Sequence, residues 1–157
     1  MGENNLNTGE GKAMTNVRHI LEQKGLHVWS VPPETTILEA ANMMFEKNIG
    51  ALIIVDNEKV VGMFSERDIA RKLMPSETPS HFVAVCEIMT PAVITVTPEQ
   101  TVDECMALMT EHRIRHLPVL EDQKIVGLIS IGDVIKAVIL EKELLLKQSS
   151  KSNTGAQ

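Results

Sequence analysis

The chain has 157 residues, of which 43% are hydrophobic and 23% charged, and its formal net charge is −6. These values are typical of one globular domain or of two small, intimately packed ones, and the acidic balance argues against general nucleic-acid binding, which needs a basic face. No apolar run is long enough to predict a membrane span, and the first residues lack the apolar region of a signal peptide.

The two cysteines give no sign of a disulfide framework or of a zinc site. Cys86 and Cys105 lie far apart in the sequence and lack CxxC spacing. His112 and His116 are close in sequence, but a helix end is expected between them, so no metal site is predicted there. A reducing, cytoplasmic location is the simplest expectation.

The chain begins with a polar segment and a short helix. Residues 1–14 are rich in Gly, Asn and Glu and are expected to form a disordered tail. Thr15 or Asn16 can cap a helix that Gly25 ends, and its apolar face is made by Val17, Ile20 and Leu21. An extended segment is expected from Leu26 to Val31.

The main body then contains one segment twice. The stretch from Ser30 to Leu73 recurs from Thr95 to Val138, with a shift of 65 positions and no gap. Turn, cap and acidic residues keep their register: Pro33 matches Pro98, Glu39 matches Glu104, Gly62 matches Gly127 and Asp68 matches Asp133. Two equivalent units are therefore predicted to pack together, and a site built from one unit is expected to have a counterpart in the other.

Each unit is predicted to follow the order β-α-β-β-α, which makes the fold class α/β, with mixed α and β elements. A capping-box pattern precedes a helical spacing of apolar residues in both units, at Thr36–Glu39 and Thr101–Glu104. Two short apolar runs separated by an Asp- or Asn-containing turn then indicate a β-hairpin, at residues 52–64 and 117–129. A last helix is expected to begin at Ser65 and at Ser130.

These elements predict four regions. The first repeat with its leading helix spans residues 15–80, and the second repeat with a C-terminal helix spans residues 81–147. Residues 1–14 and 148–157 are the expected disordered tails. Within this plan Pro75–Ser80 is a linker, Val83–Met89 is a short helix, and the apolar end of the last helix, up to Leu146, is expected to pack on the module, on the leading helix or on a second subunit.

The repeat resembles the tandem cystathionine-β-synthase (CBS) domain pair. The residues that carry the resemblance are Asn48–Val55 with Gly62–Asp68, Ile114–Val119 with Gly127–Asp133, and the bridging Ile88-Met-Thr-Pro91. The likeness covers about residues 16–146 and is greatest to stand-alone two-CBS proteins. It implies a pseudo-twofold module that binds an adenine nucleotide (AMP, ADP, ATP or NAD) in clefts between its repeats and that associates as a homodimer.

The resemblance implies a first site that both repeats build. Ser65, Arg67 and Asp68 come from the first repeat, with Asp68 accepting the ribose hydroxyls, as carboxylates do in dinucleotide sites. Arg115 and His116 of the second repeat would meet the phosphates, since guanidinium groups present a planar fork of donors, and Val93 and Ile94 would line the adenine pocket. The alternative is structural: Ser-x-x-Asp is also a capping box, and the basic residues can be solvated surface cations.

A second site would pair Ser130 and Asp133 with Gly50, Ala51 and the strand around Val28 and Trp29. Gly50-Ala51 stands where the second repeat has Arg115-His116, and Ile131-Gly132 stands where the first repeat has Glu66-Arg67. We therefore expect this site to lack two local cations and to bind a less charged ligand, to bind weakly or to stay empty. Trp29 can stack on an adenine or simply be packed in its strand.

Three functions are compared on this basis. The first is a nucleotide-binding regulatory sensor that modulates an unidentified partner protein. The second is a ligand-independent interaction or dimerisation module with degenerate clefts. The third is an enzyme, for which no catalytic apparatus is visible, so no enzymatic activity is predicted.

The first helices of the two repeats carry four methionines, which are equally consistent with a docking face and with ordinary core packing: Met43, Met44, Met106 and Met109.

Overall fold

The computed structural model describes residues 15–75, 77, 79 and 82–154. The expected tail at residues 1–14, part of the expected linker and the last three residues lie outside this range. The elements, in chain order, are α1 (Val17–Lys24), β1 (Ser30–Val31), α2 (Ile37–Lys47), β2 (Ala51–Asp56), β3 (Lys59–Ser65), α3 (Glu66–Asp68), the π-helix η1 (Ile69–Leu73), α4 (Val85–Ile88), α5 (Val102–His112), β4 (His116–Glu121), β5 (Lys124–Ser130) and α6 (Ile131–Thr154).

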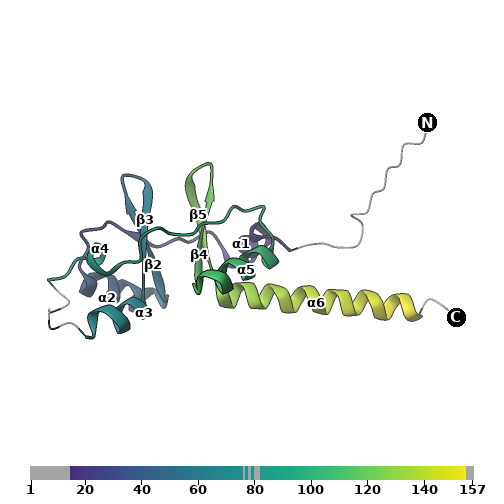
Figure 1. Cartoon of the computed structure of the whole chain (residues 1–157). Coiled ribbons are helices and arrows are strands. Elements are labelled where there is room, and N and C mark those ends of the chain that lie inside the picture. The colour runs from purple at the N-terminus through teal and green to yellow at the C-terminus, as the bar shows by residue number, and fades with distance from the viewer. Residues whose placement is uncertain (1–14, 76, 78, 80–81, 155–157) are drawn as a thin grey trace.

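The two repeats form two small sheets whose hairpins stand side by side (Figure 1). In the first sheet β1 is parallel to β2 and β2 is antiparallel to β3. In the second sheet β4 pairs antiparallel with β5, and Val96 makes a single parallel bridge to Val119 in the place of β1. The predicted β-α-β-β-α order is thus confirmed, except that the first strand of the second repeat is reduced to that bridge.

Both predicted hairpins are confirmed, and each closes with two residues of positive φ. Asn57 and Glu58 have φ values of 49° and 66°, and Asp122 and Gln123 have values of 51° and 65°. Two central residues in the left-handed region match the right-handed twist of the flanking strands. Asn and Asp tolerate this conformation better than most residues, which favours the observed register.

The helices that precede the repeats are exchanged between them. α1 packs on the second repeat: the backbone N–H of Val17 donates to the carbonyl of Gln100 at 2.9 Å, and that of Val102 donates to Thr15 at 3.0 Å. α4 packs in the same way on the first repeat, where the N–H of Val85 donates to Thr35 at 2.7 Å. The predicted regions 15–80 and 81–147 follow the sequence order. In the structure, however, the helix at residues 17–24 belongs to the second repeat.

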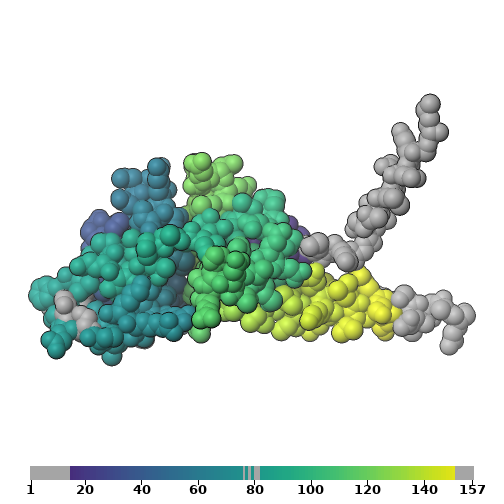
Figure 2. Space-filling model, in the orientation of Figure 1, coloured from purple at the N-terminus to yellow at the C-terminus, as the bar shows by residue number. Residues whose placement is uncertain are grey.

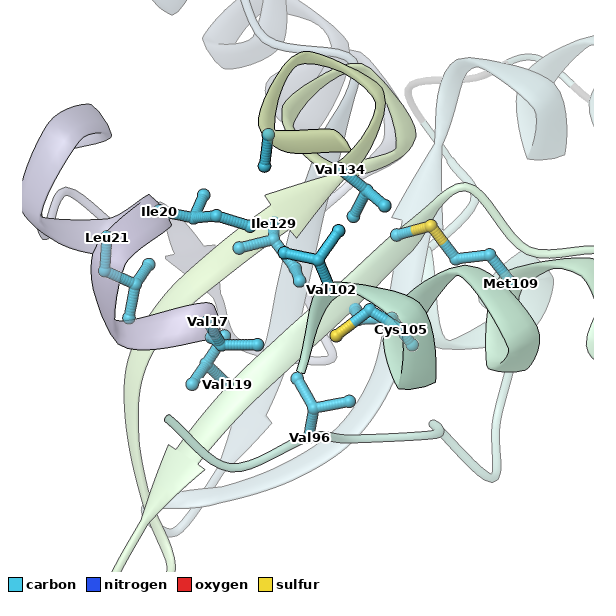
Figure 3. Close-up of a cluster of buried hydrophobic side chains, with 12 residues drawn as sticks. Val17, Ile20, Leu21, Val96, Val102, Cys105, Met109, Val119, Ile129 and Val134 are labelled. Atoms are coloured by element: carbon cyan, nitrogen blue, oxygen red, sulfur yellow. The ribbon is translucent and has the colours of Figure 1, made fainter. Parts of the chain in front are cut away.

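Each repeat has its own core, and the exchanged helix completes it. Figure 3 shows the second core, in which the α1 side chains meet residues of α5, β4, β5 and α6. Within it Cys105 is fully buried, and that burial raises the pKa of its thiol to about 11. Met44 and Met109 are core residues, Met43 is partly buried and Met106 is 36% exposed, so the first helices combine packing with some exposed apolar surface.

Two glycines on the strands allow the exchanged helices to approach closely. A Cβ added to Gly127 would meet Cδ2 of Leu21 at 2.4 Å, and one added to Gly62 would meet Sδ of Met89 at 2.4 Å. Neither glycine has a positive φ. They are therefore required by packing against α1 and against the end of α4, and not by backbone conformation.

α6 is longer than expected. It continues through Thr154, so the expectation of a loose tail from residue 148 is wrong for residues 148–154. The sequence has neither glycine nor proline between Gly132 and Gly155, so nothing in this stretch breaks the helix. Its first half packs against α5 and α1, and its second half extends beyond the body of the protein (Figure 2).

We predict that Gly127→Ala destabilises the protein by about 1–3 kcal/mol, the usual effect of overpacking a filled interior. The added methyl group would collide with Leu21 and push α1 off the second repeat. Urea denaturation measures the free energy of unfolding. Gly132→Ala is the matched control, because the nearest atom to its Cβ lies at 3.6 Å; equal effects of the two changes would contradict the prediction.

Candidate functional site

A cavity of about 420 Å³ lies between the two repeats, and we call it cleft 1. Its volume is in the range of small-molecule sites. The first repeat contributes Gly50, Met63, Ser65, Glu66, Arg67 and Asp68; the segment between the repeats contributes Thr90, Ala92, Val93 and Ile94; the second repeat contributes Arg113, Ile114, Arg115 and His116. All seven residues predicted for the first site are in this lining.

The carboxylate of Asp68 is held in a capping box at the start of α3. Its Oδ2 accepts from the backbone N–H of Ser65 at 2.9 Å and from the Ser65 hydroxyl at 3.2 Å, and the N–H of Asp68 donates to Ser65 Oγ at 3.4 Å. Its Oδ1 accepts from the Thr90 hydroxyl at 3.2 Å and lies 3.2 Å from Lys72 Nζ. The capping interpretation of Ser-x-x-Asp is confirmed, and Asp68, although only 7% exposed, also lines the cavity.

Three arginines surround cleft 1 with exposed side chains. Arg67 lies on α3, and Arg113 and Arg115 lie in the turn that joins α5 to β4. Arg113 ends α5 in the left-handed conformation, with φ 54°, which turns the chain toward β4. The lining also contains two carboxylates, those of Glu66 and Asp68. The three arginines therefore leave a local excess of positive charge in the cavity, although the protein as a whole is acidic. Val93 and Ile94 supply an apolar wall.

A second cavity of about 360 Å³, cleft 2, lies on the other side of the contact between the repeats. Of the residues predicted for the second site, Trp29, Gly50, Ala51 and Ser130 are in its lining, whereas Val28 and Asp133 are not. The remaining lining residues are Lys24, Gly25, His27, Asn48, Ile49, His116 and Leu128. The repeat positions of this site carry no cation, as expected, but α1 brings the ammonium of Lys24 into the cleft from outside the repeat register.

Lys24 holds the carboxylate of the second site. Its Nζ donates to Asp133 Oδ2 at 2.7 Å and to the carbonyl of Leu128 at 2.8 Å. Burial by itself raises the pKa of Asp133, but the hydrogen bonds from Lys24 and Ser130 outweigh burial, so the pKa lies below its usual value. The capping box repeats that of α3, with the Ser130 N–H donating to Asp133 Oδ2 at 2.8 Å.

One face of Trp29 is already occupied. Lys47 Nζ lies 4.4 Å from the centroid of its ring, a cation–π contact. Trp29 lies directly before β1, is 36% exposed and borders cleft 2, so it is neither packed within a strand nor free on both faces. Stacking on an adenine stays a prediction for its other face.

His116 borders both clefts. Burial lowers the pKa of its imidazole below 6.5, and the cationic groups of Lys24 and Arg115 lower it further. The carboxylates of Asp133 and Glu66 oppose this shift. One side chain therefore senses charges in the two clefts at once.

The comparisons with known proteins identify the family. The family model described as CBS domain matches residues 16–75 and 85–140, which together form most of the chain. The chain belongs to the CBS domain family. It is 36% identical over 141 residues to the mitochondrial CBS domain-containing protein CBSX3 of Arabidopsis thaliana, covering 83% of this chain and 68% of that protein.

Solved CBS structures agree with this assignment. The structure of the CBS domain protein NE2398 has a TM-score of 0.77 and 44% identity, and covers 80% of this chain and 99% of that one. The CBS-domain protein ATU1752 of Agrobacterium tumefaciens has a TM-score of 0.75 and 38% identity, and covers 78% and 98%. This chain is thus a CBS pair, a regulatory module of a generally non-catalytic kind. Among its described residues no helix is long and apolar enough to cross a membrane.

Sequence reasoning about the CBS pair missed the residues that come from outside the repeat register. Thr90 lies between the two copies, and Lys24 and His27 lie before the first copy, so all three are outside the segments that the shift of 65 positions aligns. Arg113, the counterpart of Asn48, was also not among the predicted site residues. The signal that could have found Lys24 is its position in the last turn of α1, directly before the helix stop at Gly25.

We predict that His116 makes the CBS pair less stable in mild acid. Because the folded-state pKa of His116 lies below 6.5, the unfolded chain binds this proton first as the pH falls. The contribution of His116 is therefore fully present above pH 6.5 and is lost progressively below it. Urea unfolding on both sides of that pH should show a smaller loss for His116→Gln than for the wild type.

The matched control for this measurement is Leu26→Gln, which changes an exposed residue of the same region and removes no titratable group. It should keep the wild-type difference in unfolding free energy between the two pH values. An acid-induced loss that is the same in wild type and His116→Gln would contradict the prediction.

Proposed function

We propose that this CBS pair is an adenine-nucleotide sensor whose ligand (AMP, ADP, ATP or NAD) binds in cleft 1. The observation that carries the proposal is that Asp68 of one repeat and Arg115 of the other line a single cavity. A carboxylate suits the two hydroxyls of a ribose, and a guanidinium suits the phosphates. One nucleotide in this cleft would contact both repeats at once.

A ribose hydroxyl that binds Asp68 has to compete with the groups that already donate hydrogen bonds to this carboxylate. Both oxygens of Asp68 already accept hydrogen bonds. Of the donors, Ser65 at Oδ2 and Thr90 at Oδ1 line the cleft, whereas Lys72 does not. A ribose hydroxyl would therefore take the place of Thr90 at Oδ1, exchanging one neutral donor for another. The bonds from Ser65 to Oδ2 would remain and would keep the carboxylate oriented.

Regulation then requires two arrangements of the repeats with different affinity for the ligand, since a ligand bound equally by both shifts nothing. A nucleotide bound to both Asp68 and Arg115 supplies this difference in affinity, because it can contact both residues only when the two repeats are at the right distance. The regulated protein would read the resulting arrangement.

We predict that Asp68→Asn weakens nucleotide binding by about 10- to 100-fold, the loss expected for hydrogen bonds to a charged group. A thermal-shift panel of AMP, ADP, ATP and NAD, followed by calorimetry, measures the affinity. Asp56→Asn, at an exposed position in the first hairpin, is the matched control and should bind like the wild type.

Because Asp68 also caps α3, a second variant separates ligand binding from folding. Arg115→Gln leaves the capping box intact and should weaken ATP more than adenosine, since adenosine has no phosphate. No thermal shift of the wild type with any of the four nucleotides would contradict the sensor and would favour the ligand-independent interaction module.

We also propose that the CBS pair functions as a homodimer through the helices on its outer face. Large apolar side chains remain exposed there: Phe45 is 87% and Leu38 44% exposed on α2, and Ile131 and Ile135 are 41% and 45% exposed on α6. A solved CBS-CP12 protein of cyanobacteria, 26% identical with a TM-score of 0.72, is hexameric. Self-association would remove this apolar surface from water.

We predict that Phe45→Glu shifts the protein from dimer to monomer, because the interface would then have to bury a carboxylate in place of an aromatic ring. Sedimentation velocity at several protein concentrations measures the oligomeric state. Leu26→Glu, at a position that is 68% exposed in the loop after α1, is the control and should remain dimeric. A wild-type monomer, or a Phe45→Glu dimer of unchanged stability, would contradict the prediction.

A further inference from the structure

Lys24 occupies a place in cleft 2 that packing determines. It is the last residue of α1, whose apolar face is built into the core of the second repeat. Leu21, one turn earlier, fits against Gly127 of β5. The Lys24 side chain is thereby directed across β5, where its ammonium contacts both the carbonyl of Leu128 and Asp133.

The two carboxylates differ in which group faces the cavity. In cleft 1 Asp68 lines the cavity, whereas its cation, Lys72, does not; Lys72 lies one turn along the same helical segment and also donates to the carbonyl of Ile88 at 2.9 Å. In cleft 2 the order is reversed, because Lys24 lines the cavity and Asp133 does not. The ammonium of Lys24 thus stands between the cavity and the carboxylate.

The pseudo-symmetric position in cleft 1 has no ammonium group. Met89 packs against Gly62 as Leu21 packs against Gly127, so the two exchanged segments can be superimposed at these residues. Beyond them the segments differ: α1 continues as a helix to Lys24, whereas α4 ends at Ile88 and Ala92 lies in the non-helical chain that follows, with φ 54°. Ala92 lines cleft 1 with a methyl group, which leaves the way to Asp68 open.

We propose that Lys24 is the specificity-determining residue that closes cleft 2 to nucleosides, so that the chain binds one nucleotide, in cleft 1. The hydrogen bonds to Asp133 from Lys24 and Ser130 fall on Oδ2, so a ribose would have to reach Oδ1 past the ammonium of Lys24, which lines cleft 2 where Asp133 does not. Cleft 2 then accepts only ligands that do not need the carboxylate. The inference rests on the proposed function of cleft 1 and extends it to the second cleft.

Isothermal titration with AMP and with ATP tests the inference through the number of sites per chain. We expect one site in the wild type and two in Lys24→Met, which retains the length of the side chain without its charge. Asp133→Asn should leave the wild-type affinity unchanged, because its carboxylate is not used. Lys72→Met is the matched control: it removes the cation of the other carboxylate and should keep one site.

The double variant Lys24→Met/Asp68→Asn assigns the sites. Binding of one nucleotide by this variant supports the inference, because the gained site then uses Asp133; a third change, Asp133→Asn, should abolish it. One site in both wild type and Lys24→Met overturns the inference while leaving cleft 1 as proposed. No site in the wild type and one in Lys24→Met overturns the proposed function of cleft 1 but supports the role of Lys24. Two sites in the wild type, or none in both proteins, overturn the inference.

Discussion

The exchange of α1 and α4 between the repeats is the contact on which the remaining structure depends. Each repeat alone is a small sheet with helices on one side, and a unit of that size buries too little surface to be stable by itself. The backbone bonds of Val17 to Gln100 and of Val85 to Thr35, with the close contacts at Gly127 and Gly62, insert a segment of one unit into the core of the other. Neither core is complete without the exchanged segment, and the exchange holds the repeats at the separation that leaves two clefts between them.

The same exchange makes the clefts different although the repeats are alike. The segments that cross from one unit to the other lie outside the repeated register, so they are not bound by its symmetry. One of them carries Lys24 to Asp133, and the other places Ala92 and Thr90 near Asp68. His116 lies between the two clefts, and its pKa responds to charges in both. A symmetric fold thereby supports two chemically distinct cavities.

The Ser-x-x-Asp motif illustrates why a motif can have two roles at once. In both repeats the serine and the aspartate satisfy each other's backbone N–H groups, which stabilises the start of a helix with no ligand present. The cap also fixes the carboxylate, and a fixed carboxylate is what a binding site needs. Whether the aspartate can then meet a ligand depends on its surroundings, which differ between Asp68 and Asp133 even though the motif is the same.

The sequence by itself determined the repeat, the order of elements, both hairpin turns and the helix starts, because these follow from local spacing and turn chemistry. With the family resemblance it also named part of the lining of cleft 1, since Asp68 and Arg115 lie in aligned parts of the two copies, but it did not name Thr90 or Arg113. Only the tertiary structure decided which repeat α1 completes, how far α6 extends from the body, and that Lys24 covers Asp133. These features depend on contacts between residues far apart in the chain, and Lys24 and Asp133 share no local pattern that could join them before the fold brings them within 2.7 Å.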